Sequence, residues 1–380
     1  MTLGPRILAS AWLAIPAIAQ VKLDPAIEDS RQAFKAFEAT WAAEGAPPLK
    51  CRVQPLEPRM GFSFRYWAGF QTFIPIAEFP ARQTRLAFML RVRAKAKGGF
   101  GEPGYFLESG SLPEASRRPR WSEVPLSGGI YMGPGEYEIR WLANDDQRRV
   151  CRHQWAVKIR GKAKESALAP GEVDSVGLEN WRGAKRAGSG SRVTVFLHAA
   201  PRWRGRNFVK LNGYDRMLML NSLTSLLDLG GFASAQVVAY DMAGRRVLFQ
   251  DAQFNPPGYQ KLSQTLRDTG FGTVDYQVLA KGPSEAKFLA TLIEQSLSAA
   301  EKPDTIVFLG PELRGVRRLP GEFEGLPERL PRVYYLALGR DVVAQGDMVS
   351  KLVKAAKGKT YLVLRGRDLL SPIRAVARGK

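Results

Sequence analysis

The chain has 380 residues, of which 56 are Lys or Arg and 36 are Asp or Glu, so it carries a formal net charge of +20. This length leaves room for two ordinary domains, because single hydrophobic cores rarely grow far past about 250 residues. The 45% hydrophobic content supports packed cores. The positive charge favours encounter with anionic partners but determines no fold.

The first 19 residues have the features of a secretory signal peptide. Arg6 precedes the apolar run 7–15, which is too short to span a bilayer, and Ala17 and Ala19 give the small-x-small pattern of a cleavage site. We expect cleavage after Ala19, with an uncleaved anchor as the alternative, and a mature protein in the periplasm or outside the cell. No later segment offers about 18 consecutive apolar residues, so we expect no transmembrane segment in the mature chain.

Cys51 and Cys151 are the two cysteines of the chain. In an exported protein such a pair most simply forms a disulfide, and the alternative is two buried free thiols. A metal site is disfavoured, because Zn²⁺ requires about four ligands and the only histidines are His153 and His198. We therefore expect a disulfide and neither a metal nor another cofactor.

Residues 20–46 are expected to form an N-terminal helix. Phe34, Phe37 and Trp41 follow helical spacing, and Gly45 with the prolines after it ends the run. Packing onto the neighbouring domain is the favoured interpretation. A free helix that binds a partner is the alternative.

Residues 47–162 change to short alternating runs between Gly and Pro clusters, which predicts an antiparallel β-sandwich. Cys51 is expected in an early strand and Cys151 near the end of the last hairpin, so the disulfide would staple the sandwich. The segment 134–140, in which Tyr137 follows a Pro-Gly turn, resembles the entry to a late strand in immunoglobulin-like domains. The expected strands include 62–66, 86–92, 137–141 and 154–159.

A long loop rich in Gly, Pro and Arg is expected between residues 95 and 127. Its glycines in 99–104 match GxGxxG, but the motif contains a proline and opens no helix, so a dinucleotide site is rejected. The basic residues near its end offer a contact for a polyanion, with a solvated loop as the favoured alternative. These residues are Arg117, Arg118 and Arg120, beside Trp121. Residues 163–191 turn polar and end in Gly and Ser, which predicts a linker.

From residue 192 to residue 380, continuous apolar strands alternate with amphipathic helices. This pattern predicts a mostly parallel sheet covered on both faces, with one hairpin supplying an antiparallel edge strand. The expected strands are 193–197, 235–240, 247–250, 305–309, 333–338 and 360–364, and the expected helices include 217–227, 259–266, 288–297, 348–356 and 369–377. The fold class is therefore α/β in this half and all-β in the first.

The last elements of this half carry a family resemblance. Residues 347–361, followed by Asp368 and Leu369, resemble the final helix, strand and helix of the von Willebrand factor A family, and in particular its divergent bacterial members. The resemblance covers roughly residues 192–380 and implies a doubly wound α/β domain. It also implies a divalent cation at the carboxyl end of the sheet, whose coordination a partner completes with a carboxylate.

The residues that the family uses for this cation are largely missing. The resemblance implies an Asp-x-Ser-x-Ser turn after the first strand, a Thr in a later loop and an Asp after the fourth strand. This chain has His198, Ala200 and Arg202 in that turn, retains Thr273, and has Glu312 after the fourth strand. A cation would find only the hydroxyl of Thr273 and the carboxylate of Glu312 as ligands, and the charge of Arg202 would repel it. We therefore expect no metal-dependent adhesion.

The same edge is expected to bind a partner directly. Crevices beyond the carboxyl ends of strands are the usual ligand positions in open α/β sheets. Arginines there suit an acidic peptide, a phosphate-bearing glycan or a carboxylate of another protein, although ordinary surface charge is the alternative. The candidate binding residues are Arg202, Trp203, Arg204, Arg206, Thr273 and Glu312, joined by Arg314, Arg317 and Arg318.

The common catalytic motifs are absent from the sequence or fail on context. Residues 358–360 read Gly-Lys-Thr but precede a strand instead of opening a helix, so a P-loop is rejected. No GxSxG, HExxH or CxxC pattern occurs. His198 is placed to act as a base toward Asp241 or Thr273, but the sequence supplies no activated nucleophile beside it, so a structural role is favoured for it and for His153.

We therefore expect a non-catalytic, exported, metal-independent binding or scaffold protein that recognises another protein or an anionic envelope polymer. An envelope hydrolase with its site at the same edge is one alternative, and a general polyanion-binding protein is another. Nucleic acid is not expected as a partner, because no recognition module is visible and export argues against an intracellular template.

Overall fold

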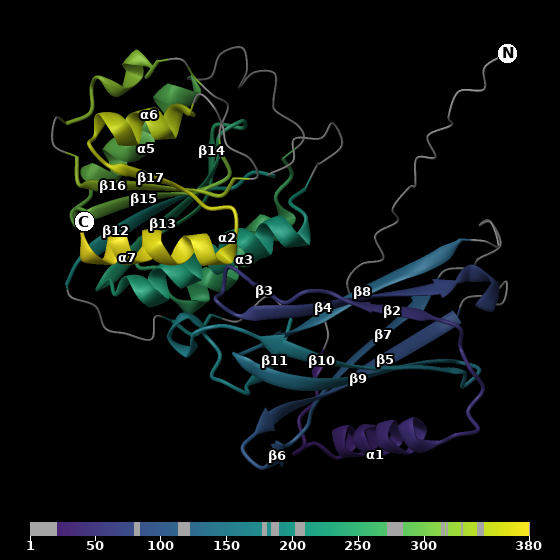
Figure 1. The fold of residues 1–380 in the computed structure, drawn as a ribbon. Coiled ribbons are helices and arrows are strands. Elements are labelled where there is room, and N and C mark those ends of the chain that lie inside the picture. Colours follow the sequence, from purple (N-terminus) through teal and green to yellow (C-terminus); the bar gives the residue numbers. More distant parts are fainter. Residues whose placement is uncertain are drawn as a thin grey trace, which may run out of the picture. The chain divides into compact units, whose positions relative to one another are not determined.

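The computed structural model describes residues 21–79, 84–112, 122–176, 181–183, 190–201, 210–271, 284–312, 316, 318–327, 330–339 and 346–379. The chain divides into two compact units, which are Met1–Arg59 with Arg65–Gly177, and Met60–Phe64 with Leu178–Lys380 (Figure 1). The predicted signal peptide, residues 1–19, lies outside the described residues. Within those residues, no helix is both long and apolar enough to cross a bilayer.

The first unit is built from two antiparallel sheets. Sheet A has the strand order β1 (Val21–Lys22), β7 (Gly104–Leu112), β5 (Thr84–Ala96), β9 (Gly135–Asp145) and β10 (Val150–Ile159), with β6 (Gly99–Phe100) paired to β5. Sheet B has the order β11 (Val173–Ser175), β8 (Glu123–Met132), β4 (Tyr66–Pro75) and β2 (Arg52–Pro55), with β3 (Arg59–Met60) paired to β4.

The two sheets share a core because the apolar side chains on the inner face of each sheet pack against those of the other. Phe70 of sheet B packs edge-on against Phe88 and Trp141 of sheet A, with ring centroids 6.2 and 6.0 Å apart. Trp141 and Phe70 are among the largest fully buried side chains. The predicted antiparallel β-sandwich is thus present.

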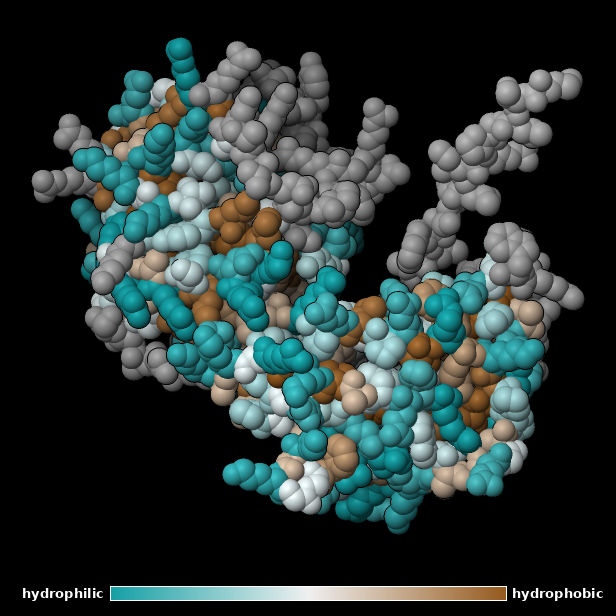
Figure 2. Space-filling model, viewed as in Figure 1, coloured by the Kyte–Doolittle hydropathy of each residue, from teal (hydrophilic) through white to brown (hydrophobic). Residues whose placement is uncertain are grey.

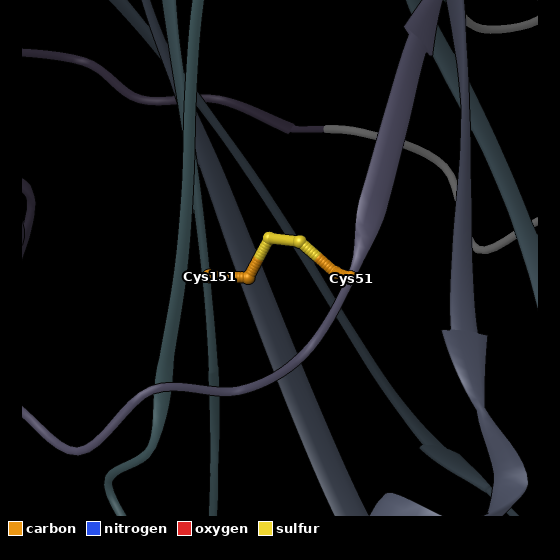
Figure 3. The surroundings of a disulfide bond; sticks show 2 residues. All are labelled: Cys51 and Cys151. Carbon is orange, nitrogen blue, oxygen red and sulfur yellow. A yellow bond between two sulfur atoms is a disulfide. The ribbon is translucent and has the colours of Figure 1, made fainter.

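The predicted disulfide between Cys51 and Cys151 is also present (Figure 3). Cys51 directly precedes β2 of sheet B instead of lying inside a strand, and Cys151 is the second residue of β10 of sheet A. Their Cα atoms are 6.2 Å apart and their sequence separation is 100 residues. The bond therefore joins the two sheets.

The predicted N-terminal helix is α1 (Glu28–Ala42), and it packs on the outer face of sheet A. Phe37 is buried there against Tyr105, and the Glu38 carboxylate accepts hydrogen bonds from Arg91 Nη1 at 2.9 Å and from the Tyr105 hydroxyl at 2.8 Å. Burial, and after it the bond to Glu38, raises the pKa of Tyr105 to about 12. The favoured interpretation of a packed helix is confirmed.

Tyr137 has the local geometry expected from its sequence. Its hydroxyl donates to the carbonyl oxygen of Gly133 at 2.8 Å, four residues upstream, as a tyrosine corner does in sandwich domains. Burial raises the pKa of Tyr137 to about 12, so the phenol remains a hydrogen-bond donor at physiological pH. The bond fixes the chain at the entry to β9.

Two expectations for loops in this unit were wrong. The range 95–127, expected to be one long loop, contains β6, β7 and the start of β8. Glycines and serines in this range have low strand propensity, so the sequence did not indicate strands there. The strands form because β7 pairs with β5 and β8 pairs with β4. The range 163–191, expected to be a linker, contains β11, which pairs with the end of β8. Arg117, Arg118, Arg120 and Trp121 lie outside the described residues.

The second unit contains a six-stranded α/β sheet. The strand order is β14 (Arg246–Asp251), β13 (Ser234–Asp241), β12 (Arg192–His198), β15 (Thr305–Gly310), β16 (Arg332–Ala337) and β17 (Lys359–Leu362). Every pairing is parallel except that of β14 with β13, which is antiparallel. The predicted, mostly parallel sheet with one antiparallel edge strand is confirmed.

Helices cover both faces of this sheet, as Figure 1 shows. One face packs against α2 (Gly213–Gly230), α3 (Pro256–Asp268) and α7 (Leu370–Arg378). The other face packs against α5 (Glu285–Leu297) and α6 (Met348–Ala355). Both sides of each central strand are buried, which explains why the strands are continuous apolar runs in the sequence.

A short segment from the first half of the sequence belongs to this second unit. Residues 62–66 were expected to form a strand, but Phe62 and Phe64 are buried in the core beside α2, and the Phe62 carbonyl accepts a hydrogen bond from Ser225 Oγ at 2.8 Å. Phe64 has a φ of 57°, and its amide bonds to the Gly61 carbonyl at 3.1 Å. This tight turn replaces the strand, and β4 begins only at Tyr66.

Candidate functional site

The α/β sheet reverses its winding between β12 and β15. Strands β13 and β14 lie beyond β12, and β16 and β17 lie beyond β15. In open α/β sheets, ligands bind outside the carboxyl ends of the strands at such a switch point. Here β12 ends at His198 and β15 ends at Gly310, so these two residues mark the candidate site.

His198 is buried, with 4% of its surface exposed, and it ties the two strand ends together. Its Nδ1 atom lies 3.0 Å from the carbonyl oxygen of Pro311, which can only accept, so Nδ1 donates. The imidazole stacks on Tyr240 with ring centroids 5.4 Å apart. Gly310 has a φ of 148°, and a Cβ there would lie 2.5 Å from the His198 carbonyl oxygen, so this close approach requires glycine.

Asp347 is the second buried polar anchor of this edge, with 1% of its surface exposed. It precedes α6 and caps it, because Oδ1 accepts hydrogen bonds from the Ser350 amide and the Ser350 hydroxyl, both at 2.8 Å. Its other oxygen, Oδ2, accepts from the Tyr335 hydroxyl at 2.9 Å. The start of α6 is thereby fixed to β16.

The two buried tyrosines, Tyr240 and Tyr335, are held in their protonated form. Burial, and after it the charge of Asp347, raises the pKa of Tyr335 and of Tyr240. Both phenols therefore keep their protons at physiological pH. We refer to His198, Tyr240, Glu312, Tyr335 and Asp347 as the polar cluster.

Glu312 is the half-buried member of the polar cluster, two residues beyond the end of β15. Its Oε2 atom lies 3.5 Å from the position that a Cβ on Gly339 would take, so the carboxyl group rests against the chain beyond β16. Burial, and after it the charge of Asp347, raises the pKa of Glu312. A carboxyl group of raised pKa in such a crevice is a candidate to bind a ligand or hold a proton.

Replacing Glu312 with Gln is expected to stabilise the second unit at pH 7 and to have little effect near about pH 3.5. The folded state raises the pKa of this carboxyl group above its unfolded value, so the stability it contributes is present at low pH and lost as pH rises through the folded pKa. Because the side chain is partly exposed, solvent screening keeps the gain below about 1 kcal/mol. Urea unfolding of both proteins at the two pH values measures the change in the free energy of unfolding. An equal change at both pH values would contradict a raised pKa of Glu312 in the folded state.

The structure brings together only part of the predicted site. Glu312 lies at the switch point, as expected, and Arg318 is exposed farther along the same connection. Asp241, considered as a partner for His198, instead accepts hydrogen bonds from the Gly244 amide at 3.1 Å and from Arg246 Nε at 3.2 Å. The candidate residues Arg202, Trp203, Arg204, Arg206, Thr273, Arg314 and Arg317 lie outside the described residues.

Sequence reasoning missed three members of the polar cluster. Tyr240 and Tyr335 lie in apolar strands and have the sequence appearance of core residues. Asp347 was read only as part of a helix, although an Asp three residues before Ser350 is an N-cap signal. Within the described residues, no group of three or more His, Cys, Asp or Glu side chains is placed to hold a metal ion.

Comparisons with known proteins identify no family. No family model matches the chain, and no curated protein matches it. Among solved structures, the PilB minor pilin from Streptococcus sanguinis is similar at 8% identity with a TM-score of 0.29, over 80% of this chain and 88% of the pilin. Red sea bream transglutaminase is 8% identical with a TM-score of 0.20, and the match covers 37% of this chain and 20% of the transglutaminase. A β-glucosidase from Listeria innocua is 8% identical with a TM-score of 0.19, and the match covers 30% of this chain and 16% of the glucosidase.

Proposed function

We propose that the chain is an exported, non-catalytic binding protein whose second unit recognises a protein or an anionic envelope polymer at the carboxyl edge of its α/β sheet. The observation that carries this proposal is the position of Glu312 and His198 at the switch point between β12 and β15. Ligands of open α/β sheets occupy this position. The hydrogen bond of His198 to the Pro311 carbonyl holds the strand ends together, and that of Tyr335 to Asp347 holds the start of α6. Such fixed elements suit a preformed binding edge.

The second unit is proposed to be a von Willebrand factor A type domain that works without a metal. A doubly wound, mostly parallel sheet with one antiparallel edge strand supports this assignment. The turn after β12 supports the loss of the metal, because Ala199 and Ala200 offer no side-chain oxygen where a hard cation would need carboxylate and hydroxyl ligands. Contact with a partner is then direct.

Export is proposed from the amino-terminal sequence and from the cysteines. Structural disulfides form and persist in oxidising compartments, and the Cys51–Cys151 bond joins the two sheets of the first unit. The surface drawn in Figure 2 is mainly hydrophilic, with apolar residues in separate areas.

Capture of partners from the native cell envelope tests the binding function. The variant Arg202→Glu/Arg204→Glu reverses two charges in the stretch of sequence that follows β12. The control Lys302→Glu/Lys359→Glu reverses two exposed charges at the opposite, amino edge of the same sheet. We expect the same partner to be retained by the wild-type chain and the control and lost by the first variant. Equal retention by all three would remove the carboxyl edge as the binding site.

A second candidate function is an envelope hydrolase that acts at the same edge. The raised pKa of Glu312, next in the chain to the carbonyl that binds His198, favours it, because acid–base catalysts need such shifts. An activity panel on the purified chain separates the two functions. Turnover that is lost in Glu312→Gln supports the hydrolase, and no turnover supports the binding protein.

A further inference from the structure

A second group of charged side chains lies at the carboxyl edge, on the side of β13 and β14. It consists of Lys210, Arg216, Arg246 and Arg267, which we call the basic cluster. Lys210 precedes α2, Arg216 lies in its first turns, Arg246 begins β14 and Arg267 lies in the last turn of α3. These residues come from three separate parts of the sequence, so no local charge run reveals them.

Gly270 is the point at which these elements meet. Lys210 pairs with Gly270 in an isolated antiparallel bridge. Arg246 Nη2 donates to the Gly270 carbonyl oxygen at 2.6 Å, and Arg267 lies three residues earlier in the chain. Lys210, Arg246 and Arg267 are exposed. Backbone pairing and a side-chain bond thus hold three exposed cations around one short stretch of chain.

Arg216 adds a fourth, half-buried cation beside Arg267. Burial, and after it the charge of Arg267, lowers the pKa of Arg216. Its Nε atom is buried and has no hydrogen-bond partner among the described residues. The charge of Arg267 therefore disfavours that of Arg216, and an anion beside both would relieve this repulsion.

Nearby acids offset only part of this charge. Asp241 Oδ2 lies 3.2 Å from Arg246 Nε, and Asp268 acts on Arg216 against the effect of Arg267. These two acids neutralise only part of the four positive charges of the basic cluster. The excess on this side of the edge is positive, whereas the polar cluster beyond β15 carries Glu312 and Asp347.

We infer that the basic cluster binds the phosphate groups of an anionic polymer. A guanidinium fork pairs with two oxygens of one anionic group, and the repeating phosphates of a polymer carry such oxygen pairs at short intervals, each with a full negative charge. The cations gathered around Gly270 match such closely spaced anionic groups. This inference rests on the proposed function and deepens it, because it gives the carboxyl edge a ligand chemistry.

Binding of long-chain polyphosphate to the purified full-length chain tests the inference, with polyglutamate and neutral dextran as comparison probes. We expect polyphosphate to bind more tightly than polyglutamate, dextran not to bind, and affinity to fall steeply as salt is added. The variant Lys210→Glu/Arg267→Glu is expected to weaken polyphosphate binding at least about tenfold, because each reversal turns an attraction into a repulsion. The control Lys302→Glu/Lys359→Glu, with the same change in net charge, is expected to bind nearly as the wild type does.

A third variant separates the fork from the charge. Arg267→Lys keeps the positive charge but loses the planar fork, so we expect it to weaken polyphosphate binding, though by less than Lys210→Glu/Arg267→Glu does. Equal loss in the two charge-reversal variants, or tighter binding of polyglutamate than of polyphosphate, would overturn the inference. If polyphosphate fails to bind while envelope capture still depends on Arg202 and Arg204, the phosphate assignment fails and the proposed function stands.

Discussion

Replacing Cys51 and Cys151 with alanine is expected to lower the free energy of unfolding of the first unit by about 4 kcal/mol. The bond closes a loop with a sequence separation of 100 residues, so its loss gives the unfolded chain a large gain in conformational freedom. The bond also joins sheet A to sheet B, which otherwise meet through the apolar core. A loss of this size is a large part of the total stability of a domain.

Hydrogen–deuterium exchange of the full-length chain in urea measures this loss, because it reports each unit separately. We expect faster exchange in β5 and β9 at the centre of sheet A and no change in β12 and β15 of the second unit. Reduction of the wild-type disulfide should reproduce the effect and serves as the matched control. Unchanged exchange in β5 and β9 would contradict a stapling role for the bond.

Replacing Asp347 with alanine is expected to destabilise the second unit by about 3 kcal/mol. Loss of the cap of α6 costs about 1 kcal/mol, and the Tyr335 hydroxyl, left buried without its acceptor, costs about 1–3 kcal/mol more. Urea unfolding followed by exchange in β15 and β16 measures the sum. Because Asp347 fixes the start of α6 to β16, the binding edge should loosen as well.

Two variants divide this effect between its causes. Tyr335→Phe removes one hydrogen bond and keeps the cap, so we expect a loss of about 1 kcal/mol. Asp347→Asn keeps an oxygen for the Ser350 amide and is among the best capping residues, so it should lose much less than alanine does. A loss in Asp347→Asn as large as in Asp347→Ala would contradict the capping role and point to the charge itself.

The sequence predicted the second unit well because its elements are defined by local patterns. Buried strands such as Thr305–Gly310 are continuous apolar runs, and helices such as Glu285–Leu297 carry one apolar stripe. The hairpin of β13 and β14 is marked by Ala243 and Gly244. Each of these signals is contained within a few residues, so a single sequence is enough to read it.

The first unit was predicted less completely because pairing between distant residues defines its strands. β7 (Gly104–Leu112) contains two glycines and two serines and exists because it lies along β5, while β11 exists because it pairs with the end of β8. The run 62–66 has strand-like alternation, but its phenylalanines are buried in the core of the other unit. Tertiary contacts override local propensity in each case.

The position of the candidate site could be predicted from the sequence, but most of the residues that form it could not. The carboxyl edge follows from strand order, and Glu312 follows β15 directly in the sequence. Tyr240, Tyr335 and Asp347 come together only through the packing of β13, β16 and α6, and the cations around Gly270 come together only through a backbone bridge and one hydrogen bond. No local pattern in a single sequence specifies such contacts.

Hydrogen–deuterium exchange of the full-length chain with its captured envelope partner, carried out in EDTA, tests the central claim most directly. The account predicts that the complex survives the chelator and that the partner slows exchange at the carboxyl ends of β12 and β15 and at the start of α2. Dissociation in EDTA, or protection confined to the sandwich of the first unit, would contradict direct binding at the carboxyl edge of the α/β sheet.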